Sequence, residues 1–133
     1  MGAGRDTVND QLLRLSYKDP NNIRSLLKNW GGLESLSYKG DTVATCILAD
    51  LKMVTGIDTE LYNRDDRTAF NLGYLRGKLS HYQYMSIAYT LVLGYSQQEV
   101  AWIMGVDQSV VSKTISIGIH KIQKELNAFL EDD

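Results

Sequence analysis

The sequence predicts an all-α protein, and three observations favour this class. Apolar residues recur at spacings of three and four along most of the chain, as they do on one face of a helix. Ser, Thr or Asp residues stand before these stretches at positions typical of helix N-caps, and glycines follow them. The chain has one proline and no low-complexity tract, so extended disorder is not expected.

Length and charge set the limits for domain number and location. With 133 residues, 44% of them hydrophobic, the chain is expected to form one domain or two small helical lobes. The formal net charge is −2, as in many globular proteins. No apolar run reaches the roughly 20 residues that span a bilayer, and the N-terminus lacks the apolar core of a secretory signal. We therefore expect a cytoplasmic protein with no membrane partner.

The N-terminal lobe is predicted to begin with two short amphipathic helices. Thr7 can cap the first helix, which runs to about residue 18. Pro20 suits the first turn of the second helix, and its apolar residues follow at helical spacing. Gly31-Gly32 is expected to end that helix. The next stretch, residues 33–39, is ambiguous, and one helical turn followed by a loop is expected.

A third N-terminal helix is predicted from the N-cap Asp41 to about Val54, where Gly56 stops it. A wide apolar stripe suggests that this helix is buried between two neighbours. The stripe consists of Val43, Ala44, Ile47, Leu48, Leu51 and Val54. Cys46 lies in the same run and is the only cysteine, so we expect a buried structural thiol, no internal disulfide and no cysteine-based zinc site.

A polar connection, residues 56–65, is the predicted boundary between the N-terminal lobe, residues 1–60, and a second domain, residues 61–133. Asp65 or Asp66 is expected to begin a helix that runs to about Leu79. Gly73 and Gly77 lie four residues apart inside it. They indicate either a close helix contact or local bending.

The same set of helix signals then occurs twice. Ser80 with Gln83 forms a capping box that opens a helix ending at Gly94. A second box, Ser96 with Glu99, opens a helix that ends at Gly105. The sequence therefore predicts two capped helices in succession.

The last predicted helix is long. Asp107 is its expected N-cap, and it runs from Gln108 to about Leu130, or roughly 34 Å at 1.5 Å per residue. Its apolar stripe is Val111, Ile115, Ile119, Ile122, Leu126 and Leu130. Because a small module cannot cover this length, we expect the C-terminal half to pack on the N-terminal lobe or on a second subunit.

The two helices that meet at Gly105 have the spacing of a helix-turn-helix. Ala101 lies four residues before Gly105, where a larger side chain would push the helices apart. Val111 lies six residues after Gly105 and can pack back on Val100 and Met104. These offsets favour a helix-turn-helix over an ordinary helical hairpin.

The stretch GYSQQEVAWIMGVDQSVVSKTI, residues 94–115, resembles the helix-turn-helix of bacterial sigma factor region four and its phage relatives. The shared pattern is Gly-Tyr/Leu-Ser/Thr, two polar residues, Glu-Ile/Val-Ala, then Leu/Met-Gly-Val/Ile and polar residues before Val. The resemblance covers about residues 66–130. It implies a sequence-specific DNA-binding transcription regulator of a phage or prophage, such as the small ArpU-like late-gene regulators. It also implies that the protein acts in the cytoplasm of a bacterium or an infected host.

The start of the last helix carries the residues expected to bind double-stranded DNA. Its outer face holds Gln108, Ser109, Ser112, Lys113 and Ser116. In a helix-turn-helix this is where side chains meet base edges in the major groove. Gln97 and Gln98, at the start of the preceding helix, are expected to contact the DNA backbone. The alternative is an ordinary solvated helix face.

Trp102 stands at a position that usually faces solvent and is often charged in the region-four pattern. An exposed tryptophan there predicts a contact surface for a partner subunit or RNA polymerase. The other interpretation is that the N-terminal lobe covers it. Charges from residue 96 to 126 sum to zero, so a monomer is expected to bind DNA weakly. We therefore expect a homodimer or docking on another DNA-bound protein.

Other functions remain open at this level. The sequence offers no catalytic constellation, no phosphate-binding glycine loop and no set of metal ligands, so we expect neither enzyme activity nor a cofactor. A recognisable promoter-melting segment is missing, which argues against a complete sigma factor. The alternatives are a packaging adaptor such as a terminase small subunit, which would form a ring, or a protein-interaction module.

Overall fold

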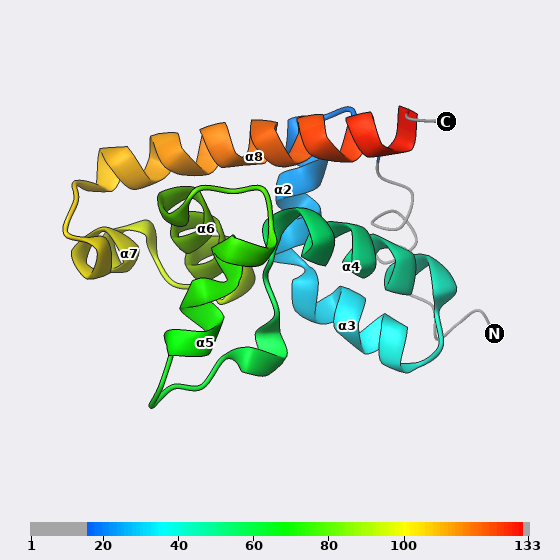
Figure 1. The fold of residues 1–133 in the computed structure, drawn as a ribbon, viewed down its shortest axis with the longest axis horizontal. Coiled ribbons are helices and arrows are strands. Elements are labelled where there is room, and N and C mark those ends of the chain that lie inside the picture. The colour runs from blue at the N-terminus through cyan, green and yellow to red at the C-terminus, as the bar shows by residue number, and fades with distance from the viewer. Residues whose placement is uncertain (1–15, 132–133) are drawn as a thin grey trace.

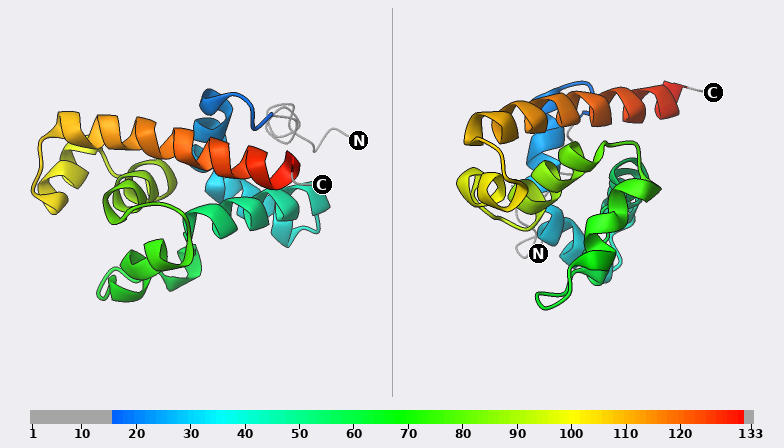
Figure 2. Two further views of the ribbon diagram at one scale, coloured as in Figure 1. Left: turned by 45° about the horizontal axis from the view of Figure 1, so that its top comes forward. Right: turned by 60° about the vertical axis from the view of Figure 1, so that its left-hand side comes forward.

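The computed structural model describes the backbone of residues 16–131 and the side chains of residues 16–128. Every regular element in this part of the chain is a helix or a helical turn, and the elements pack along one long helix, α8 (Gln108–Glu131) (Figure 1). The left view of Figure 2 shows the first described helix, coloured blue, on one side of α8 and the other shorter helices on the opposite side. Most of the helix predicted over residues 7–18 lies outside the described residues.

The N-terminal lobe begins with α2 (Pro20–Lys28) and α3 (Trp30–Tyr38). The Asp19 carboxylate caps α2 by accepting the Asn21 N–H at 2.9 Å. The expectation that Gly31-Gly32 ends this helix is wrong. Both glycines lie in the first turn of α3, because Asn29 already ends α2 and the burial of Trp30 and Leu33 keeps the next residues helical. Residues 33–38 are therefore helix, and Lys39 lies in the turn that follows.

Helix α4 (Thr42–Thr55) begins and ends where the sequence predicts. Asp41 accepts the Ala44 N–H at 3.0 Å, and Gly56 ends the helix with a left-handed φ of 78°. Two expectations about its faces are wrong, since Cys46 is exposed and Val43 is 49% exposed. The reason is the way in which α4 is turned about its own axis. The neighbours α3 and α8 cover the face that holds Ala44, Ile47, Leu48, Leu51 and Val54, and positions 43 and 46 point to the other side.

The segment after α4, which the sequence predicts to be a polar connection, contains a helical turn. After a helical turn, η2 (Thr59–Leu61), come α5 (Thr68–Asn71) and a tighter 3₁₀ stretch, η3 (Leu72–Arg76). The continuous helix predicted from Asp65 or Asp66 to Leu79 is therefore wrong. Close backbone contacts made by Gly73 and Gly77 with the end of α4 replace regular helix here. The sequence left two explanations for these glycines, a close contact or local bending, and the structure shows a close contact.

The next helix, α6 (His81–Ile87), opens with the predicted capping box and continues as a π-helical turn, η4 (Ala88–Val92). The Ser80 hydroxyl accepts the Gln83 N–H at 3.2 Å, and the Gln83 side chain accepts the Ser80 N–H at 3.0 Å. Gly94 follows with φ 83°, as expected for the end of this segment.

One continuous cluster of buried side chains joins the N-terminal lobe to the rest of the chain. The described stripe of α8 is fully inside it: Val111, Ile115, Ile119, Ile122 and Leu126 are at most 2% exposed. The C-terminal half of α8 packs on the N-terminal lobe, the first of the two expected arrangements. Gln123 and Asn127 donate side-chain hydrogen bonds to the carbonyl groups of Lys18 and Tyr17. Within residues 16–131, no helix has both the length and the apolar composition to cross a membrane.

Candidate nucleic-acid interface

The site is built on α7 (Gln97–Met104) and the start of α8. The Ser96 hydroxyl accepts the Glu99 N–H at 3.0 Å, and the Glu99 carboxylate accepts the Ser96 N–H at 2.9 Å. This reciprocal pair satisfies two N–H groups that a helix start leaves without partners. It fixes the direction in which α7 leaves the preceding loop, and the predicted capping box is confirmed.

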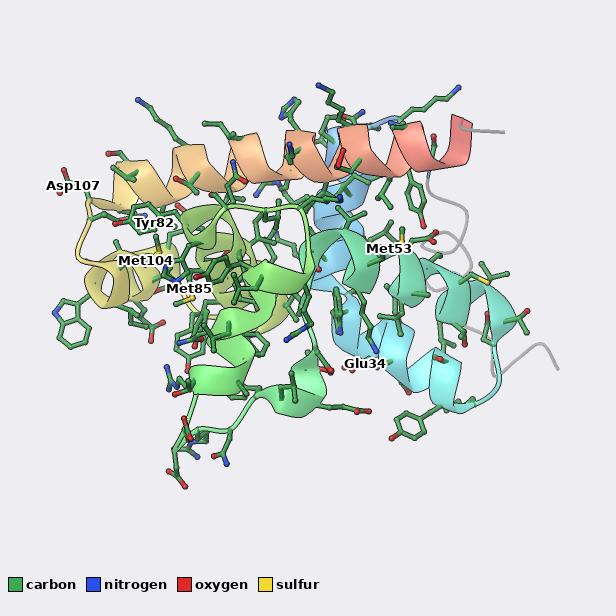
Figure 3. All side chains as sticks on the ribbon, in the orientation of Figure 1. Glu34, Met53, Tyr82, Met85, Met104 and Asp107 are labelled. Carbon is green, nitrogen blue, oxygen red and sulfur yellow. The ribbon has the colours of Figure 1, made fainter. Side chains whose placement is uncertain are left out.

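A tight turn at Gly105 joins α7 to α8. Gly105 has φ 70° and ψ 35°, and the Val106 N–H donates to the Ala101 carbonyl at 3.0 Å. Side chains from both helices meet behind the turn, where Val100, Ala101 and Val111 are at most 5% exposed. Asp107 marks the corner at one end of the molecule, and Met104 lies on the inner side of α7 facing α6 (Figure 3). The helix pair with its glycine turn therefore lies where the sequence predicts it.

The polar residues predicted to contact DNA share one exposed surface at the start of α8. All five are exposed: Gln108, Ser109, Ser112, Lys113 and Ser116. They occupy the side of α8 that the buried Val111 and Ile115 leave exposed, within about 12 Å along the helix axis. On α7, Gln98 is exposed and Gln97 is half-buried. The fold thus brings residues of both helices to the same end of the molecule.

Lys113 is the only cation among these polar residues. No carboxylate in the described residues forms a salt bridge with it, so its ammonium group is free to bind an external anion. The Glu99 carboxylate is occupied by the capping box, and its hydrogen bond with the Ser96 backbone holds the pKa of Glu99 below its ordinary value. Glu99 therefore stays negatively charged, and the surface is polar with no excess of positive charge.

Trp102 lies on the opposite face of α7 from the core and is 86% exposed. Residues 16–60 of the N-terminal lobe do not cover it. Of the two interpretations, exposed or covered by that lobe, the structure shows the exposed one. Trp102 lines an open pocket of about 520 Å³. Its other lining residues are Arg67, Tyr95, Gln98, Glu99 and Ile103.

The surroundings of Arg67 are a feature of the site that sequence reasoning missed. Its guanidinium carbon lies 5.8 Å from the ring centre of Tyr62, 5.8 Å from that of Tyr89 and 5.5 Å from that of Tyr95. The hydroxyl groups of Tyr62 and Tyr95 are 2.9 Å apart and hydrogen-bonded, which raises the pKa of Tyr62. The three tyrosines come from separate segments, so no local sequence pattern indicates that they surround one cation.

No protein-family model, curated protein or solved structure matches the chain. In the part of the chain that the structure describes, no three His, Cys, Asp or Glu side chains lie close enough together to hold a metal ion. What the protein does must therefore be inferred from its own surfaces.

Proposed function

We propose that the chain is a sequence-specific DNA-binding transcription regulator that reads double-stranded DNA with the start of α8. One observation carries this proposal: α7 and α8 meet at a tight glycine turn, and the first turns of α8 expose a compact set of polar side chains. An α-helix with its side chains is about 10–12 Å across and fits the major groove, which is about 12 Å wide.

Each exposed side chain has a suitable role at such a surface. Gln108 can pair with the two hydrogen-bonding groups on the edge of adenine, and Lys113 can bind guanine or a phosphate. Ser109, Ser112 and Ser116 can bond to bases or phosphates. Gln97 and Gln98, in the first turn of α7, would position the helix pair on the DNA backbone.

The charge of the surface bears on how the protein would act. With one lysine among the proposed contacts and a net charge of −2, few phosphates can be neutralised. We therefore include a second DNA-bound subunit in the proposal, as a homodimer, and contact with RNA polymerase through Trp102. The weak charge and the exposed tryptophan also support a second candidate, a module that binds protein and not DNA.

A binding titration separates the two candidates. Duplexes enriched from a random library would be titrated against the wild-type chain and the variants Gln108→Ala and Lys113→Ala, with fluorescence anisotropy as the readout. The matched control is Lys39→Ala, which removes an exposed lysine at the end of α3, far from α7. Loss of one base or phosphate contact is expected to weaken binding by about tenfold. Equal affinities for all four proteins would rule out the proposed contacts, and a library from which no duplex is enriched would support the protein-binding candidate.

A further inference from the structure

The outer face of α8 carries positive charge beyond the residues proposed to read DNA. Four exposed side chains follow one another along it and form a basic stripe: Lys113, His120, Lys121 and Lys124. Within residues 108–128, the only carboxylate of this helix is that of the half-buried Glu125. Figure 3 shows side chains that end in nitrogen along the upper edge of α8. In this part of the helix, lysines therefore outnumber carboxylates.

Helical spacing places the basic stripe on the side of α8 that faces away from the core. Lys113, His120 and Lys124 stand seven and four residues apart, which is the spacing of one face of a helix. The buried Ile115 and Ile122 lie across the helix from them. At 1.5 Å per residue, Lys124 lies roughly 16 Å further along the axis than Lys113. The stripe thus extends the exposed surface at the start of α8.

The lysines of the stripe are available to an external anion. No carboxylate of residues 16–128 forms a salt bridge with Lys121 or Lys124. Each ammonium group therefore keeps its three donors for a partner or for water. The Nδ1 atom of His120 donates to the Ser116 carbonyl at 2.9 Å, which leaves its Nε2 atom for an outside group. Together these side chains suit a chain of anionic groups.

The segment that precedes α2 lies against the C-terminal part of α8 and leaves the stripe exposed. Gln123 and Asn127 donate side-chain hydrogen bonds to the carbonyl groups of Lys18 and Tyr17. Lys18 is exposed, but the exposed Asp19 follows it and carries the opposite charge. This segment therefore adds no net charge, and the excess of lysine belongs to α8.

The shape and polarity of this surface favour a nucleic-acid backbone as its partner. The 24 residues of α8 span about 36 Å, whereas the major groove is about 12 Å wide. A straight helix whose start lies in the groove therefore runs out past the phosphates that border it. Ile117, at 59% exposed, is the one large apolar side chain exposed between residues 113 and 124, so the face is mainly polar.

We propose that Lys121 and Lys124, with His120, bind phosphate groups of the DNA backbone beside the site read by the start of α8. These contacts depend on the proposed function, because the start of α8 must hold the duplex against the stripe. They carry no sequence information, and they supply affinity that Lys113 alone does not.

The test measures the salt dependence of binding to a duplex of arbitrary sequence by fluorescence anisotropy. The wild type is compared with a stripe variant, which carries Lys121→Gln and Lys124→Gln. Each lost phosphate contact lowers the slope of log affinity against log salt concentration by about 0.9, so the slope is expected to fall by about 2. Near 0.1 M salt, the loss of affinity is expected to be about tenfold for each lysine.

The matched control carries Lys28→Gln and Lys39→Gln, which remove two exposed lysines at the ends of α2 and α3. Its net charge equals that of the stripe variant, and it is expected to keep the wild-type slope. Gln108→Ala is also expected to keep the slope, because it changes a proposed base contact and not a phosphate contact. Phosphate binding and base reading are therefore measured separately.

Three results would overturn the proposal. These are an unchanged slope in the stripe variant, an equal loss in the matched control, and a wild type that binds no duplex even at low salt. A failure of base reading has a different result. The wild type would then bind all duplexes equally well, while the stripe variant would still show the smaller slope.

Discussion

Gly56 and Gly73 are in direct backbone contact: a Cβ atom added to Gly73 would lie 2.6 Å from the Gly56 carbonyl oxygen. Gly56 ends α4 and Gly73 lies in η3, so this contact joins the N-terminal lobe to the second part of the chain. Neighbouring hydrogen bonds strengthen the junction. Arg76 donates to the Gly56 carbonyl at 2.9 Å, and the Lys78 N–H donates to the Val54 carbonyl at 2.7 Å.

Gly73→Ala is therefore expected to destabilise the protein by about 2–3 kcal/mol, because the added methyl group meets backbone that cannot move aside. The matched control is Gly31→Ala in α3, where a Cβ would meet no atom within 4 Å. There, alanine is expected to stabilise the protein by about 0.5–1 kcal/mol, since it favours helix over the unfolded chain. Urea denaturation monitored by circular dichroism gives both values. Similar effects at the two positions would show that the junction is not close-packed.

Gly105→Ala tests the turn between α7 and α8. Nothing lies within 4 Å of the position of an added Cβ, so any cost comes from the left-handed backbone, φ 70°. The expected loss is about 1–2 kcal/mol. Gly105→Asn is expected to lose less, since asparagine adopts this conformation more readily. A chain in which both substitutions are neutral in urea denaturation would not contain the turn described here.

The two capping boxes are expected to respond differently to pH. The second box uses Glu99, whose pKa is lowered in the folded protein by the hydrogen bond with the Ser96 backbone. A lowered folded pKa contributes stability above the unfolded value, here 4.5, and that stability is lost as pH falls through the folded pKa. Below pH 4.5, Glu99→Gln is therefore expected to lose less stability than the wild type.

The first box provides the reciprocal test because it uses Gln83, which does not titrate. Gln83→Glu is expected to add a loss of stability in the same acidic range. Thermal melts between pH 3 and 6 measure both variants against the wild type. Identical pH profiles for all three proteins would mean that the Glu99 carboxylate does not stabilise the start of α7.

Much of the fold could be predicted because its signals are local. Ser80 with Gln83 and Ser96 with Glu99 form the boxes that their spacing indicates, and Gly56 and Gly105 end helices in left-handed conformations. In each case the residues that specify the feature lie within a few positions of one another. The bounds of α8 follow in the same way from its periodic apolar stripe.

The errors occur where distant packing decides the structure. Gly31-Gly32 looks like a helix end, but the buried Trp30 and Leu33 hold that stretch in α3. Cys46 lies in an apolar run, but α3 and α8 cover other faces of α4. At the candidate site, the exposed polar residues of α8 could be predicted from helical spacing. The arrangement of Arg67 with Tyr62 and Tyr95 could not, because it joins segments up to 33 residues apart.

The most direct test of DNA reading by α8 is selection of binding sequences from random duplex DNA with the wild type and with Gln108→Ala. The wild type is expected to enrich a defined sequence. The variant is expected to lose the preference at one base pair and to keep it elsewhere, because a single side chain specifies that position. Enrichment of the same full sequence by both proteins, or of no sequence by the wild type, would contradict the proposal that the start of α8 reads DNA.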